Sequence, residues 1–299
     1  MTLKILEPLI VGADNLESNV ALESAWSAGT YTVGQQRRVG EALYEVSAAS
    51  TTEEPSGVAV DWFSVGPDNR YAAFDTQIGL DKYRVVETVT TNDDEIEYTI
   101  TGLSRISSIA FFGLTASQIE IQATLDTNSD ILDLTYELQD NRAYDGSFWS
   151  WCFLDKQFET KYANFDLNIP SGTSIFIRIS NTGATARVGS VVLGVVEDYG
   201  TVTADSTRAG RSRSVRKTDG LYTSLLRRTP SATIGYKVVL TDGDAERFWH
   251  KMNAVDGLGT VFSGPDSSPE LLTYGFLTAS STVAKGNGIS TAIVEVEQL

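Results

Sequence analysis

The sequence predicts a mainly β protein: a central antiparallel β-sandwich, jelly-roll-like, flanked by a β-rich N-terminal segment and a small α+β C-terminal domain. Many short stretches alternate apolar and polar residues with a period of two, as half-buried strands do. They are rich in Thr, Ser, Val, Ile and aromatic residues, and 25 glycines punctuate the 299-residue chain. The formal net charge is −16 and changes sign along the chain. It is −7 over residues 1–89, −10 over 90–198 and +1 over 199–299, and we expect three domains with these bounds.

Residues 1–89 are expected to form an irregular segment with short strands, followed by a tight turn. The stretch 51–57 has no periodicity and is predicted to be a surface loop. A Gly-Pro-Asp-Asn turn follows at 66–69, where the proline sets φ and the polar residues can bond nearby backbone. Aromatic side chains on both sides would hold this turn against a core, with an arginine bonding inward. The predicted structural clamp consists of Trp62, Pro67, Asn69, Arg70 and Phe74.

Residues 90–198 carry the clearest strand patterns. Isoleucine-rich alternation occurs at 96–100, 119–123 and 175–179, and more continuously apolar stretches occur at 107–114 and 188–196. Turn residues lie at 126–130, 170–172 and 181–183. About seven strands over about 100 residues are typical of a β-sandwich or jelly roll.

The turn at 126–130 resembles part of a calcium-binding loop. Asp126, Asn128 and Asp130 have the spacing of its first ligands, and Glu137 stands at the twelfth position. Ile131 stands where such a loop needs glycine, and the flanks are strands instead of helices. We expect a plain hairpin turn and no metal, with calcium binding as the alternative.

An aromatic cluster follows at 144–165. Strand alternation would place Trp149 and Trp151 on one face. One interpretation is a core or subunit-interface plug, because buried aromatics dominate packing energetics. The other is a glycan-binding platform formed by Trp149, Trp151 and Tyr144.

The stretch 199–231 is rich in arginine and poor in apolar residues, which favours an extended arm or a loop docked on another surface. Its arginines could bind nucleic acid, but they lack interleaved stacking aromatics and belong to an acidic protein. Docking onto an acidic neighbour, such as another copy of the chain, explains the charge better. The predicted docking residues are Arg208, Arg211, Arg213, Arg216, Arg227 and Arg228.

The rest of the C-terminal segment predicts strands and one helix. Thr241 and Asp244 form a variant of the capping box, and the apolar stripe of Phe248, Met252 and Val255 follows them. Gly257 is well placed to end the helix. His250 lies off the stripe and is expected to be a helical surface residue.

Composition excludes several function classes. With Cys152 and His250 as its one cysteine and one histidine, the chain can form no internal disulfide and no Cys/His zinc site. No nucleophile motif accompanies His250, so we expect no enzyme and no cofactor. No apolar stretch approaches 18 residues, and we expect neither membrane insertion nor a secretory signal.

The segment Trp62–Asp75, with its tryptophan, its Gly-Pro-Asp-Asn-Arg turn and its aromatic-Asp pair, resembles tail proteins of double-stranded DNA bacteriophages and prophages. Leu193–Gly200 is similar to that family's junction between its middle sandwich and its C-terminal part. Gly275–Leu277 and Ile289–Glu297 are similar to its closing strands. The Arg-rich segment after the junction departs from the family's pattern.

The resemblance implies a structural virion protein of a tail tip or baseplate, made in the host cytoplasm, with a carbohydrate-binding-like middle domain and no catalytic residues. The expected partners are other phage tail proteins and copies of the chain itself. A host-glycan-binding, receptor-binding protein is the alternative, and a polysaccharide-degrading enzyme is a third hypothesis.

Overall fold

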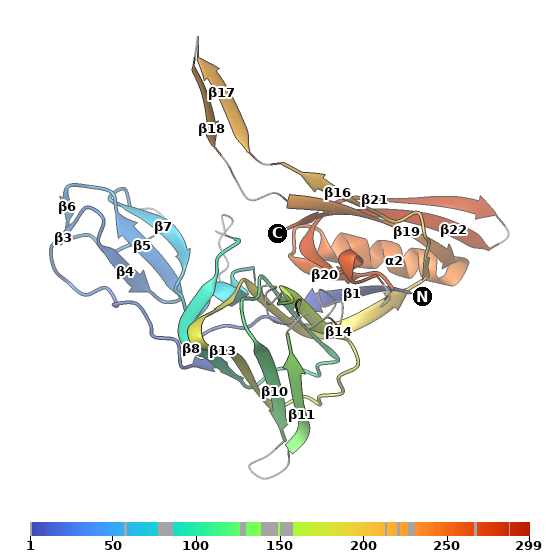
Figure 1. Ribbon diagram of the computed structural model, residues 1–299, viewed down its shortest axis with the longest axis horizontal. Coiled ribbons are helices and arrows are strands. Elements are labelled where there is room, and N and C mark those ends of the chain that lie inside the picture. The colour runs from blue at the N-terminus through green and yellow to red at the C-terminus, as the bar shows by residue number, and fades with distance from the viewer. Residues whose placement is uncertain are drawn as a thin grey trace. The chain divides into compact units, whose positions relative to one another are not determined.

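The computed structural model describes residues 2–56, 59–76, 86–125, 130–138, 149, 158–212, 214–219, 222–226, 231–265, 268–286 and 288–299. Over these residues the protein is mainly β, with curled antiparallel sheets and an α-helix of 14 residues (Figure 1). The predicted mainly β fold class is confirmed, and the sandwich arrangement of the middle segment stays a prediction.

The elements follow one another along the chain as a long series of strands. The strands are β1 (Leu3–Pro8), β2 (Leu16–Ser18), β3 (Tyr31–Thr32), β4 (Gln36–Val39), β5 (Ala42–Val46), β6 (Ser50–Thr51), β7 (Trp62–Pro67), β8 (Thr90–Ile100), β9 (Ser108–Phe112), β10 (Gln118–Thr124), β11 (Asp130–Glu137), β12 (Lys161–Asn164), β13 (Ser174–Val188), β14 (Ser190–Tyr199), β15 (Thr201–Val202), β16 (Thr207–Arg211), β17 (Val215–Asp219), β18 (Tyr222–Leu226), β19 (Ser231–Thr241), β20 (Thr260–Ser263), β21 (Thr273–Gly286) and β22 (Ile289–Gln298). The helices are η1 (Ala72–Phe74), α2 (Asp242–Val255) and η3 (Pro269–Leu271).

The chain divides into two compact units. Unit 1 comprises Met1–Pro8 and Val195–Leu299, and unit 2 comprises Leu9–Gly194. Residues 1–8 thus belong with the C-terminal part, whereas we expected them in one segment with residues 9–89. The physical reason is strand pairing distant in sequence: β1 is antiparallel to β20, with Ile5 opposite Phe262.

A five-stranded antiparallel sheet forms the centre of unit 2, in the order β11-β10-β13-β8-β2. Its register places Ile121 beside Ile177, and Ile177 beside Tyr98. All three side chains are buried in one core, which also contains Phe111 of β9 and Leu193 of β14. Burying one such side chain contributes about 1.5–3 kcal/mol, so one face of the sheet is held inward.

The N-terminal part of unit 2 forms two smaller sheets, β3-β6 and β4-β5-β7. They enclose a separate small core of Tyr31, Val46 and Trp62. The rings of Tyr31 and Trp62 meet edge to face, with centroids 5.7 Å apart. Short strands and a core this small agree with the irregular segment that the sequence predicted.

The predicted turn at 181–183 is wrong. These residues lie within β13, where the pairing with β8 shifts between Ser180 and Thr185. At this bulge the backbone N–H of Gly183 donates a hydrogen bond to Asp94 Oδ1 (2.7 Å), and both residues have positive φ. The residues that predicted a turn instead form a bulge inside a long strand. A glycine can adopt positive φ in a turn and in a bulge alike, so its presence does not distinguish the two.

Unit 1 combines a sheet with the helix α2. The sheet order is β1-β20-β21-β22-β19-β15, and β16 also pairs with β19. Phe248, Met252 and Val255 of α2 are buried with inward residues of β19 and β22, which confirms the predicted apolar stripe. Within the described ranges, no helix is both long enough and apolar enough to span a lipid bilayer.

The predicted capping box does not form. Thr241 is the N-cap residue with extended backbone, but its side chain makes no hydrogen bond to the helix backbone. Its hydroxyl donates to the Asp244 carboxylate instead (2.7 Å). The aspartate side chain is shorter than that of the usual glutamate, and here it bonds the hydroxyl in place of the N-cap backbone.

An ionic network joins three segments of unit 1. Lys251 Nζ lies 2.7 Å from Glu7 Oε2 and 2.8 Å from Glu197 Oε1, and the Lys251 side chain is 11% exposed. The Tyr199 hydroxyl donates to Glu197 Oε2 (2.7 Å). Burial raises the pKa of Glu197, but the hydrogen bonds from Lys251 and Tyr199 outweigh it and hold that pKa below its ordinary value. The network therefore fastens β1 and the end of β14 to α2.

We predict that Lys251→Met lowers the free energy of unfolding by about 1–3 kcal/mol at neutral pH, because Glu7 and Glu197 lose the ammonium group that lies between them, although Arg247 remains 3.5 Å from Glu197. A lowered pKa means that Glu197 contributes stability above its unfolded-state pKa and loses it as pH falls through the folded-state value. Urea titrations between pH 7 and pH 2 should show the two proteins converging in acid. If the difference in unfolding free energy between the parent and Lys251→Met stays constant over this pH range, the ionic network does not contribute to stability as described.

Gly200 stands where β14 leads into β15, with φ +44°. A Cβ at this position would overlap the backbone oxygen of Val239 and the side chain of Leu240. We predict that Gly200→Ala destabilises the protein by about 2–4 kcal/mol, through strain and overpacking together. Gly243→Ala, whose Cβ would meet open space at the start of α2, is the matched control and should be neutral or slightly stabilising in the same thermal melts.

Candidate docking surface

A run of basic sequence, residues 208–228, continues from the sheet of unit 1; we call it the basic arm. It begins in β16, which is antiparallel to β19 and places Arg208 opposite Ile234. The arm then forms a hairpin of β17 and β18, paired from Val215 with Leu226 to Asp219 with Tyr222. Over the described residues these two strands pair only with each other, and Figure 1 shows them as a separate ribbon beyond β16.

Large apolar side chains of the hairpin are exposed. Val215 is 48% exposed, Leu225 67% and Leu226 56%. Val215 and Leu226 are opposite each other and share one face, and Leu225 alternates to the other. A lone two-stranded hairpin is marginally stable in water, and grouped exposed apolar side chains are typical of protein-binding surfaces.

The predicted docking arginines all belong to the basic arm. Arg208 is exposed on β16. Arg211 lies in β16 and Arg216 in β17, opposite Leu225, although their side chains are outside the described part of the chain. Arg213, Arg227 and Arg228 are outside the described residues. The backbone thus brings Arg208, Arg211 and Arg216 onto consecutive strands.

The root of the arm borders a cavity of about 360 Å³, between Val202–Arg208 and Pro265–Leu271. Its lining mixes apolar side chains with the charges of Arg208 and Glu270. The hydroxyl of Thr203 in this lining is buried and has no hydrogen-bond partner among the described residues. The arm therefore begins beside a concave surface that combines apolar, polar and charged groups.

The turn that the sequence singled out joins segments of unit 2. Asp68 is fully buried, and its carboxylate accepts a hydrogen bond from the backbone N–H of Arg70 (3.1 Å). Asn69 exchanges two hydrogen bonds with the backbone of Thr91, each 2.9 Å long. Arg70 Nε donates to the backbone oxygen of Val20 (2.9 Å). The turn begins later than the predicted 66–69, because Gly66 and Pro67 are the last two residues of β7 and the backbone N–H of Tyr71 bonds the backbone oxygen of Asp68. The polar side chains of Asp68, Asn69 and Arg70 thus form hydrogen bonds with backbone groups of the same chain, and these contacts have a structural role.

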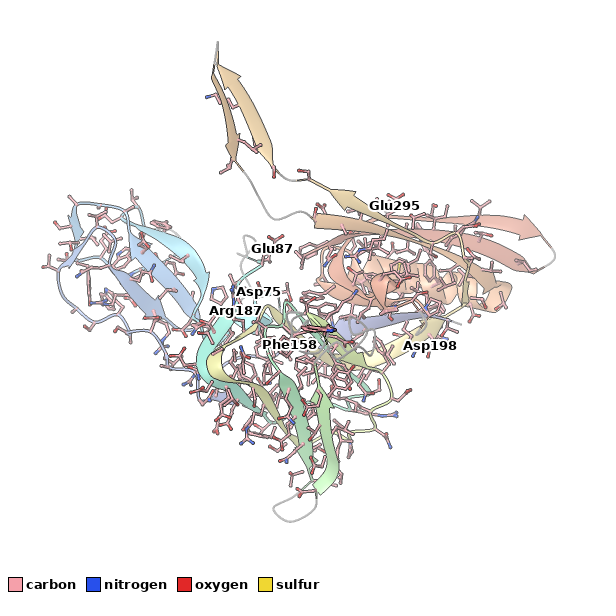
Figure 2. The ribbon with its side chains drawn as sticks, in the orientation of Figure 1. Asp75, Glu87, Phe158, Arg187, Asp198 and Glu295 are labelled. Carbon is pink, nitrogen blue, oxygen red and sulfur yellow. The ribbon has the colours of Figure 1, made fainter. Side chains whose placement is uncertain are left out.

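The aromatic members of the predicted clamp lie in two different cores. Trp62 belongs to the small N-terminal core, and Phe74 to the main core of unit 2, where its ring meets Tyr98 edge to face at 5.2 Å. Next to Phe74, burial raises the pKa of the Asp75 carboxyl, although Thr88 donates two hydrogen bonds to it. A hydrogen bond from the backbone of Glu87 also lowers the pKa of this carboxyl, and Figure 2 labels both residues. The segment thus connects two cores instead of holding one turn.

The aromatic platform is described at one position only. Trp149 is 68% exposed. Its backbone is helical, so the strand alternation expected at this position is wrong. Trp151 and Tyr144 lie outside the described residues, and their place in a platform stays a prediction.

Of the candidate calcium ligands and the single histidine, the structure describes Asp130, Glu137 and His250. Asp130 is exposed and accepts a hydrogen bond from Thr124 Oγ1 (3.0 Å), while Asp126 and Asn128 are outside the described residues. In the part of the chain that the structure describes, no three His, Cys, Asp or Glu side chains gather as metal ligands would. His250 is exposed on α2, with Nε2 3.8 Å from Glu246 Oε1.

Sequence reasoning missed the apolar part of the hairpin. The arginines indicated only that the arm is charged. The alternation of apolar and polar residues around Val215, Leu225 and Leu226 is too short to predict strands. The signal that could have found them is Leu225-Leu226 directly before the Arg227-Arg228 pair. Comparisons with protein-family models, curated proteins and solved structures find no match for this chain.

Proposed function

We propose that the protein is a structural component of an assembly and that it docks through its basic arm onto acidic surfaces of other proteins, including copies of itself. The observation that carries this proposal is the β17–β18 hairpin, whose large apolar side chains are exposed. Covering Val215, Leu225 and Leu226 would stabilise a hairpin that is marginal alone.

Charge supports the same function. The basic arm holds six arginines and Lys217 against Asp219, whereas unit 2 holds 11 basic and 26 acidic residues, a formal net charge of −15. Opposite potentials steer encounter and fix the orientation in which two molecules meet. A second copy therefore offers the arm a complementary surface.

The assembly that we propose is the tail tip or baseplate of a tailed bacteriophage or prophage, with several copies around the tail axis among other tail proteins. The support is the resemblance carried by Trp62–Asp75 and by Leu193–Gly200. The role that we propose is non-catalytic and needs no cofactor.

We predict that the full chain self-associates at about 1–100 µM in low salt, the range of small charged interfaces. Replacing Val215–Leu226 by a short Gly-Ser turn should leave a monomer in sedimentation equilibrium. Its thermal melt should match that of the parent, because these strands pair only with each other over the described residues. Equal association of both proteins, or a monomeric parent, would overturn the proposal.

A second candidate function, binding of a host-surface glycan, is favoured by the exposed Trp149. Exposed aromatic rings can stack on the apolar faces of sugars. We predict that Trp149→Ala abolishes any signal of the full chain on a glycan array, while Trp249→Ala, a tryptophan 44% exposed on α2, leaves it intact. Binding that survives Trp149→Ala would exclude this residue as the platform.

A further inference from the structure

The face of the five-stranded sheet turned away from the core is polar and acidic. Because strand side chains alternate, the residues between the buried isoleucines of β8, β10 and β13 all point to this face. Those of β2 and β11 follow the same alternation. We call the part of this surface between the bulge of β13 and the bulge of β10 the acidic sheet face, and its charged residues are Glu17, Glu95, Glu97, Glu120, Asp133, Glu137 and Arg178.

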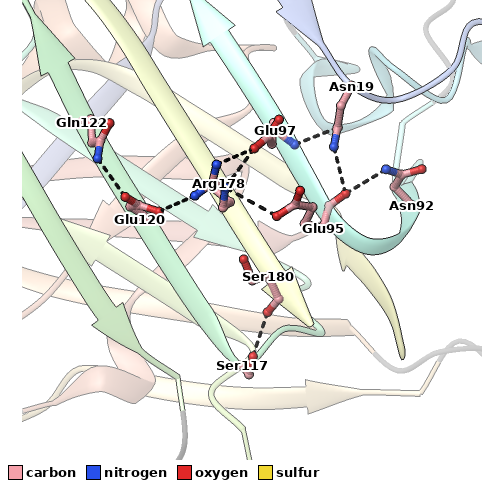
Figure 3. Close-up of polar contacts among 9 residues, drawn as sticks. All are labelled: Asn19, Asn92, Glu95, Glu97, Ser117, Glu120, Gln122, Arg178 and Ser180. Atoms are coloured by element: carbon pink, nitrogen blue, oxygen red, sulfur yellow. Dashed lines mark hydrogen bonds and ion pairs between the residues drawn. The ribbon is translucent and has the colours of Figure 1, made fainter. Parts of the chain in front are cut away.

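Arg178 organises the centre of the acidic sheet face. Its guanidinium lies 2.8 Å from a carboxylate oxygen of Glu97, 3.1 Å from one of Glu120 and 3.5 Å from one of Glu95. Figure 3 shows these carboxylates converging on the arginine from both neighbouring strands. The same guanidinium lies over the ring of Phe176, 5.2 Å from its centroid. The carboxylates are therefore held in place before any partner arrives.

This face has an excess of negative charge. One guanidinium stands against six carboxylates in the set above, and the Arg178 side chain remains 38% exposed. Glu17, Asp133 and Glu137 stand on strands at the two sides of the sheet and are exposed. Glu137 accepts a hydrogen bond from Gln118 (3.0 Å), a neutral donor that leaves its charge uncompensated.

We propose that the acidic sheet face of one copy is the acceptor for the basic arm of a second copy. The inference rests on the proposed docking function and names the surface that receives the arm. The charges are complementary: five basic residues and Asp219 in residues 208–226 face six carboxylates and Arg178. Phe176 offers an apolar ring within this face, beside which Leu225, on the same face of the hairpin as Arg216, can pack.

The contact is heterologous, since each copy gives its arm and receives another on a different surface. It can therefore extend to more than two copies, as a ring or a filament, which an assembly component requires. Because both surfaces are exposed, screening by salt weakens the contact as the Debye length falls from about 10 Å at 0.1 M to about 3 Å at 1 M.

The test is a charge swap in the full chain, measured by sedimentation equilibrium in low salt. The arm variant is Arg216→Glu with Lys217→Glu, and the face variant is Asp133→Lys with Glu137→Lys, which leaves the partners of Arg178 in place. Each pair should weaken self-association about tenfold, as expected for two exposed charge reversals. Their combination should restore association toward the parent value, because new pairs form with reversed sign. The matched control is Glu54→Lys with Asp14→Lys, exposed acids outside the face, which should leave association nearly unchanged.

The outcomes separate the two proposals. If the arm variant weakens association and the face variant does not, the arm docks elsewhere and the present inference is overturned while the proposed function stands. If both variants weaken association and their combination does not restore it, the two surfaces do not meet. In that case too the present inference is overturned and the proposed function stands. If neither variant changes association, both proposals fail. Unchanged thermal melts for every variant exclude misfolding as the cause.

Discussion

Burial of alternate side chains along β8, β10 and β13 is the constraint on which unit 2 depends. Because the period of a strand is two, the pattern that hides Ile121, Ile177 and Tyr98 also turns the intervening residues to the opposite face. That opposite face carries Arg178 and its carboxylates. The core and the acidic sheet face are therefore two consequences of one alternation, and a shift of register by one residue would destroy both.

Unit 1 depends on contacts between residues far apart in the sequence. β1 pairs with β20, and Lys251 binds both Glu197, 54 residues earlier in the chain, and Glu7, 244 residues earlier. Over the described residues, the β17–β18 hairpin of the basic arm pairs with no strand of this framework. Its exposed apolar side chains contribute little to the stability of their own chain, which is why we propose that they take part in association.

Strands with strong alternation and the stripe of α2 were predictable, because a local period reports directly which face is buried. Two local predictions failed where a contact distant in sequence intervened: Gly183 serves a bulge against Asp94, and Trp62 and Phe74 enter different cores. A third failed locally, because Thr241 bonds the short side chain of Asp244 instead of the helix backbone.

By itself the sequence determined a mainly β chain, its buried positions, its charge division and the arginines of the arm, since composition and periodicity are local properties. Only the tertiary structure decided that residues 3–8 complete the C-terminal sheet, that the arm is a hairpin with exposed leucines, and that carboxylates from two strands surround Arg178. These features depend on strand order and register, which arise when side chains distant in sequence compete for the same core.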